Sequence, residues 1–129
     1  MSEHVPMTAA SLLVNGAIFS QTDLDADADP DLHPAVVEFF RRLPPAQREP
    51  FMGHCAETAL ISDQLWGLDQ RSGSGRPTTL DEAMGHFAGS ALVARKIRSE
   101  GDPEHGRPAE PCRSCAALLA RLGVATVDR

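Results

Sequence analysis

The chain has 129 residues, of which 42% are hydrophobic and 23% charged, and its formal net charge is −6 at pH 7. This length predicts one domain over residues 1–129, with residues 1–9 as a flexible N-terminal arm. The acidic balance makes nucleic acid a less favoured partner, because nucleic-acid binders gain affinity from basic residues that neutralise phosphates. No apolar run is long enough to span a membrane, and residues 1–4 lack the features of a secretory signal, so a cytoplasmic location is expected.

Two short apolar runs, at 11–14 and 17–21, flank the dipeptide Asn15-Gly16. An Asn-Gly pair between such runs is typical of a two-residue hairpin turn, because both turn positions need a positive φ. The sequence therefore predicts two antiparallel strands at the start of the domain.

Four helices and two more strands are predicted downstream from hydrophobic periodicity and from helix start and stop signals. Pro34 suits the first turn of a helix, Thr79 and Glu82 form a capping box, and Gly123 is a helix stop. The predicted helices cover 34–43, 55–68, 80–89 and 112–122, and the predicted strands cover 91–98 and 124–127. The resulting order, β-β-α-α-α-β-α-β, is that of an α/β fold in which helices cover a small sheet.

The most informative residues are the three cysteines, Cys55, Cys112 and Cys115. An odd number cannot form a closed set of disulfides, and clustered thiols in a reducing compartment more often bind metal or carry out redox chemistry. Cys112 and Cys115 are three residues apart at a helix start, which places their Cβ atoms about 5–6 Å apart on one face. One Zn²⁺ could bind both sulfurs, and Cys55 begins another predicted helix, with Glu57 two residues further on.

Three interpretations of these residues remain open at this point. A catalytic zinc site has three protein ligands and one open position, which Cys55, Cys112 and Cys115 would provide. A structural site has a fourth ligand, which His54 could supply. A redox Cys-x-x-Cys pair would need neither a third cysteine nor Glu57.

The segments GHCAE at 53–57 and PCRSC at 111–115 together resemble the zinc signature of the cytidine deaminase superfamily, including its three-cysteine variant. The longer run at 111–124 is similar to the YwqJ-type deaminases associated with bacterial toxin systems. The resemblance covers about residues 10–127. It implies a cytidine deaminase-like three-layer α/β/α fold, whose small mixed sheet combines an antiparallel hairpin with parallel strands.

The resemblance also implies roles for the site residues. The signature has a ligand two positions before its glutamate, so Cys55, Cys112 and Cys115 would hold Zn²⁺ and Glu57 would be the catalytic residue that moves protons. His54 would line the pocket or cap the helix. The implied activity is hydrolytic deamination of a cytosine-type nucleobase, in nucleoside metabolism. Acidic charge and small size favour a free nucleobase, nucleoside or nucleotide over cytosine in single-stranded nucleic acid, and a non-enzymatic zinc protein that acts as a binding partner is a third hypothesis.

Two departures from the family pattern carry further predictions. Thr58 stands where small cytidine deaminases often have an arginine that relieves the charge of three thiolates, and Arg113 is the candidate to compensate that charge here. The chain has one strand after the last motif helix, where the family usually has another. This leaves an open sheet edge that a second subunit could cover, so a homodimer is predicted.

Overall fold

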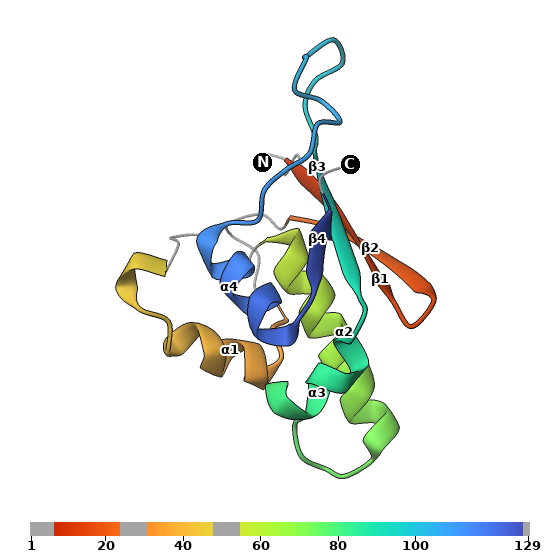
Figure 1. Cartoon of the computed structure of the whole chain (residues 1–129), viewed down its shortest axis with the longest axis vertical. Coiled ribbons are helices and arrows are strands. Elements are labelled where there is room, and N and C mark those ends of the chain that lie inside the picture. Colours follow the sequence, from red (N-terminus) through yellow and green to blue (C-terminus); the bar gives the residue numbers. More distant parts are fainter. Residues whose placement is uncertain (1–6, 24–30, 48–54, 128–129) are drawn as a thin grey trace, which may run out of the picture.

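The computed structural model describes residues 7–23, 31–47 and 55–127. Its helices and strands follow the predicted order, with one additional 3-10 turn, η1 (Figure 1). The elements are β1 (Thr8–Val14), β2 (Ala17–Thr22), α1 (Pro34–Arg41), η1 (Pro45–Gln47), α2 (Ala56–Ser72), α3 (Leu80–Phe87), β3 (Ala91–Lys96), α4 (Arg113–Leu122) and β4 (Ala125–Val127).

The four strands form one mixed sheet in the order β2-β1-β3-β4. β1 is antiparallel to both β2 and β3, and β3 is parallel to β4. The turn between β1 and β2 has φ values of 51° at Asn15 and 79° at Gly16, which is the left-handed conformation that this dipeptide favours. The predicted mixed sheet, a hairpin combined with a parallel pair, is confirmed.

The core lies between one face of this sheet and the helices. Alternate residues of β1 and β3, among them Leu12 and Leu92, point into it and are buried. Helix α2 packs against β1 and β2, and α4 contacts α1, α2 and α3. Figure 1 shows α2 and α4 beside each other next to the sheet, and apolar side chains such as Leu60 and Leu118 hold them there. This packing brings the N-terminal ends of α2 and α4 together.

The opposite face of the sheet is partly open. Leu13 and Ile18 are cross-strand partners on this face and are 46% and 71% exposed, and Val127 of β4 is 39% exposed. The described part of the chain consists of this sheet and the helices that cover its buried face. It is a compact α/β arrangement of the deaminase-like kind. None of the helices in these residues is long and apolar enough to cross a membrane.

The start of α1 is fixed by a buried histidine. His33 is the N-cap residue, and its Nδ1 accepts a hydrogen bond of 3.0 Å from the backbone N–H of Ala35. With Nδ1 as acceptor, the Nε2–H donates to Asp69 Oδ2 of α2 at 2.7 Å. His33 is thus a structural residue that joins α1 and α2.

Several element boundaries differ from the prediction. β1 begins at Thr8, which pairs with Lys96, so residues 8 and 9 of the predicted N-terminal arm belong to the sheet. α2 extends four residues beyond the predicted end at 68 and stops at Gly73, which has a φ of 59°. The apolar periodicity ends at Leu68, but the exposed last turn continues until a residue can adopt the left-handed conformation.

Candidate metal centre and active site

The three cysteines lie at the beginnings of two helices. Cys55 is the N-cap residue of α2, Cys112 is the N-cap residue of α4, and Cys115 is in the first turn of α4. The first N–H groups of a helix have no partner within the helix and carry partial positive charge. Both helix ends therefore offer an environment that favours negatively charged sulfur.

The geometry of the sulfurs fits one metal ion. All three Sγ atoms lie within 4.8 Å of one another, and the Sγ atoms of Cys55 and Cys112 are 3.4 Å apart. A disulfide needs about 2.05 Å, and all three cysteines are free. Tetrahedral Zn–S bonds of about 2.3 Å place two sulfurs about 3.8 Å apart, which is within the range seen here. These residues could bind a metal.

The thiols share protons unequally when no metal is bound. The pKa of Cys112 is lowered by its hydrogen bonds with the thiols of Cys115 and Cys55, and further by the backbone N–H groups of Cys115 and Ser114. The pKa of Cys55 and that of Cys115 are raised, mainly by the same hydrogen bonds to Cys112. A divalent cation bound by the three sulfurs would replace the protons that the thiols hold.

Glu57 lies beside this cluster in the first turn of α2 and is only 4% exposed. Burial raises its pKa, its own backbone N–H opposes that shift, and the negative charges of Cys112 and Asp23 raise it further. A raised pKa in a buried carboxyl group is typical of residues that transfer protons in active sites. The three sulfurs thus have a buried carboxyl group with a raised pKa beside them.

Thr58 contacts the sulfur cluster, and this contact was not predicted from the sequence. Its side chain is fully buried, and its Oγ1 lies 3.1 Å from the Sγ of Cys115. The sequence showed that Thr58 follows Glu57, but the meeting of α2 with α4 that creates this contact is set by tertiary packing.

Arg113 and His54 were the other two predicted site residues. The exposed side chain of Arg113 donates from Nη1 to the carbonyl of Ala46 at 2.8 Å, and Ser114 Oγ donates to the carbonyl of Gln47 at 2.8 Å. Both bonds hold the start of α4 against η1. The role of Arg113 in charge compensation stays a prediction, and His54 lies outside the described residues.

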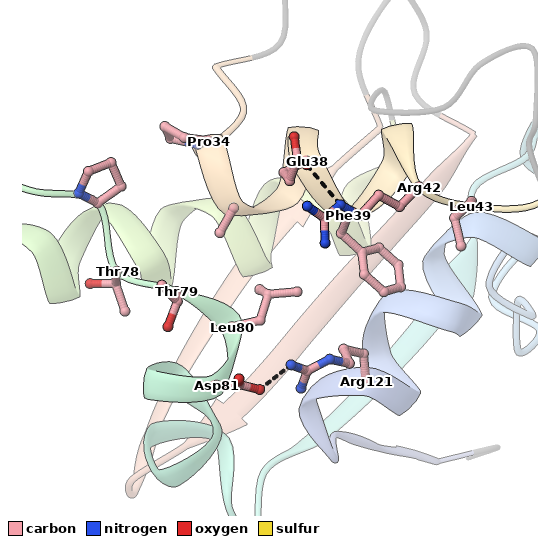
Figure 2. Close-up of a pocket in the computed structure, with 12 residues that line it drawn as sticks. Pro34, Glu38, Phe39, Arg42, Leu43, Thr78, Thr79, Leu80, Asp81 and Arg121 are labelled. Atoms are coloured by element: carbon pink, nitrogen blue, oxygen red, sulfur yellow. Dashed lines mark hydrogen bonds and ion pairs between the residues drawn. The ribbon is translucent and has the colours of Figure 1, made fainter.

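A groove of about 530 Å³ lies elsewhere on the molecule, between α1, α3 and the end of α4 (Figure 2). Phe39 and Leu80 supply apolar side chains to it. Its arginines are in ion pairs, Arg42 with Glu38 and Arg121 with Asp81, as Figure 2 shows. Neither the cysteines nor Glu57 line this groove, so it is separate from the sulfur cluster.

Comparison with known proteins identifies a family for this chain. The profile of the YwqJ-like deaminase family matches residues 3–124, a range that includes Glu57 and all three cysteines. Comparisons with curated proteins and with solved structures found no match. The family agrees with the resemblance carried by the two motifs, and the matched range covers most of the chain. The chain therefore belongs to the YwqJ-like deaminase family.

Proposed function

We propose that this protein is a zinc-dependent hydrolytic deaminase in which Cys55, Cys112 and Cys115 hold Zn²⁺. The observation that carries the proposal is the position of three sulfurs within 4.8 Å of one another, beside the buried Glu57, in a chain of a deaminase family. Three protein ligands leave the fourth tetrahedral position open, as in catalytic zinc sites. Zn²⁺ bound there would act as a Lewis acid that lowers the pKa of a water molecule.

Glu57 would carry the protons of this reaction. Its carboxylate would take a proton from the attacking water and deliver it to the ring nitrogen, and the next proton transfer would go to the departing amine. The overall change is the replacement of an exocyclic amino group by oxygen, with water consumed and ammonia released. Proton transfer by a positioned side chain typically contributes a factor of about 10²–10⁴ to the rate.

The proposed substrate is a cytosine-type base, as the free nucleobase, nucleoside or nucleotide, and the reaction would belong to nucleoside metabolism in the cytoplasm. The net charge of −6 supports a small substrate, because a long polyanion would be repelled. Cytosine in single-stranded nucleic acid is the alternative substrate, and binding that weakens steeply with salt would distinguish it.

A non-enzymatic zinc protein is the rival function. The burial of Glu57 argues against it, because an ionisable carboxyl group is costly to bury and a purely structural site has no use for one. Asp69 has a structural role, because it accepts hydrogen bonds from His33 and from the backbone N–H of Thr78. Glu57, in contrast, lies beside the sulfur cluster and has a raised pKa.

The decisive experiment is a screen for ammonia release by the zinc-loaded protein across nucleobases, nucleosides, nucleotides and single-stranded DNA, with Glu57→Gln as the matched control. We expect one class of cytosine compound to release ammonia and the variant to keep its zinc but lose at least about 10²-fold in rate. Unchanged activity of Glu57→Gln would refute the proton-carrying role. No ammonia from any compound, with zinc bound stoichiometrically, would favour the non-enzymatic function.

A further inference from the structure

Thr58 places a hydroxyl group against one sulfur of the cluster. The residue is in the first turn of α2, it is fully buried, and Cys115 on α4 is 1% exposed. The distance from Oγ1 to Sγ is 3.1 Å, so the two atoms are hydrogen-bonded. The contact joins the two helices that carry the cysteines, at the most deeply buried of the three sulfurs.

The direction of this hydrogen bond depends on whether Cys115 has its proton. A thiol can donate to the hydroxyl oxygen, and a hydroxyl can donate to the sulfur. A sulfur that coordinates a metal is a thiolate, which has no proton and can only accept. With metal bound, the hydroxyl proton of Thr58 must therefore point at the sulfur for the contact to persist.

We propose that Thr58 is a positioning residue that donates a hydrogen bond to the metal-bound sulfur of Cys115 and withdraws charge from it. The proposal rests on the proposed function, because it requires Cys115 to be a metal ligand. Three thiolates on a divalent ion leave a net negative centre, and a donor to one sulfur reduces the electron density that this sulfur gives to the metal. The metal would then be a stronger Lewis acid.

A second sulfur has a comparable donor within the fold. The Sγ of Cys112 accepts from the backbone N–H of Cys115 at 3.4 Å, as the cap of α4. Helix α4 thus supplies a backbone donor to the sulfur of Cys112, and α2 would supply a side-chain donor to the sulfur of Cys115. Partners of this kind around metal ligands typically change metal affinity by about 10–100-fold when they are removed.

The test compares Thr58→Val, which replaces the hydroxyl by a methyl group at nearly constant volume, with Thr58→Ser, which keeps the hydroxyl. Ser62→Ala is the matched control. Ser62 is a buried hydroxyl one turn further along α2, and it accepts from the backbone N–H of His33 instead of contacting a sulfur. Ser62→Ala should therefore lower stability without affecting the metal.

The first readout is the sulfur-to-metal charge-transfer band of the Co²⁺-loaded protein, and the second is metal affinity measured against a competing chelator. A hydrogen bond to sulfur lowers the energy of its lone pairs, so its loss should move the band of Thr58→Val to longer wavelength. We expect affinity at pH 7 to fall about tenfold in the same variant. Thr58→Ser should resemble the wild type in both readouts, and Ser62→Ala should keep the wild-type band.

A Thr58→Val protein that binds Co²⁺ with the wild-type band and affinity would overturn the proposal. If Thr58→Val does not fold, the proposal is decided by Thr58→Ser, and a shifted band in that folded variant would refute it. Wild-type protein that binds neither Zn²⁺ nor Co²⁺ would instead refute the proposed metal site, and this inference with it.

Discussion

A carboxyl group at position 57 reduces the stability of the fold. Glu57 has a pKa raised above 4.5, with burial as the main cause. A group whose pKa is higher in the folded than in the unfolded state contributes stability below its unfolded pKa, and that contribution is lost as pH rises through its folded pKa. Ionisation of this buried carboxyl group therefore disfavours folding, a cost that catalysis would explain.

We predict that metal-free Glu57→Gln is more stable than the metal-free wild type at pH 7. The difference should shrink as pH falls through the folded pKa of Glu57 and vanish below about 4.5, because the neutral carboxyl group then resembles the amide. Urea unfolding of both chelator-treated proteins across this pH range measures it. Parallel stability curves at all pH values would contradict the assignment.

The protonation state of His86 also affects the stability of the fold. Its pKa is lowered in the folded state, whereas the pKa of Glu57 is raised. Its Nδ1 lies 3.1 Å from Asn15 Nδ2, which can only donate, so Nδ1 accepts and the ring is neutral. Its Nε2–H then donates to Gln64 Oε1 at 2.8 Å. Burial lowers the pKa of His86 below 6.5, and the nearby charge of Arg71 adds to this shift.

We expect His86 to contribute stability that is fully present above pH 6.5 and is lost as pH falls through its lowered folded pKa. Protonation would place an N–H of the ring against the N–H₂ of Asn15 and separate the hairpin turn from α3. Unfolding of wild type and His86→Ala at pH 8 and pH 5 should show a smaller gap between the two proteins at pH 5. A constant gap would show that the ring is not neutral in the folded state.

At the scale of elements, local chemistry accounts for most of what could be predicted. The Asn15-Gly16 turn and the capping box of Thr79 and Glu82 are confirmed, because each depends on residues adjacent in the sequence. The last turn of α2 and the short η1 were not predicted, because neither buries an apolar face that periodicity would reveal. In the same way, the sequence could suggest that Cys55 and Cys112 share a metal, but the meeting of their sulfurs and the contact of Thr58 became visible only with the packed helices.

Cys112 combines a structural and a chemical role in one element. Its sulfur caps α4 and belongs to the proposed ligand set. Serine is among the best N-cap residues, whereas alanine has no acceptor. In the metal-free state we therefore expect Cys112→Ala to be less stable than Cys112→Ser by about 1 kcal/mol.

The two variants should behave alike toward zinc, since both lack the sulfur. Thermal unfolding with and without Zn²⁺ tests this: the wild type should gain about 2.7 kcal/mol at a free zinc concentration 100 times its Kd, and neither variant should gain as much. A wild-type-like zinc response in Cys112→Ser would show that Cys112 is not a ligand.

At the scale of the whole molecule, the cluster joins parts of the chain that are far apart in sequence. Cys55 and Cys112 are separated by 57 positions, and their sulfurs meet only because α2 and α4 pack together beside the sheet (Figure 1). A metal ion there would cross-link the two helices in the folded state and be absent from the unfolded one. Metal binding and folding would then be coupled, as in other proteins whose ligands come from separate elements.

The open edge of the sheet carries the remaining prediction, a homodimer. β4 has three residues and pairs with β3 within the described part of the chain, and Val127 on it is 39% exposed. An unpaired, apolar edge can recruit a strand from a second copy. We expect wild-type protein to sediment as a dimer and Val127→Lys as a monomer, because a charge at the edge opposes its pairing.

Ile18→Lys is the matched control on β2, the other edge strand. Ile18 is 71% exposed, so this variant should stay dimeric if β4 forms the contact. Monomeric wild type at all concentrations would refute the dimer, and loss of the dimer in Ile18→Lys alone would move the contact from β4 to β2.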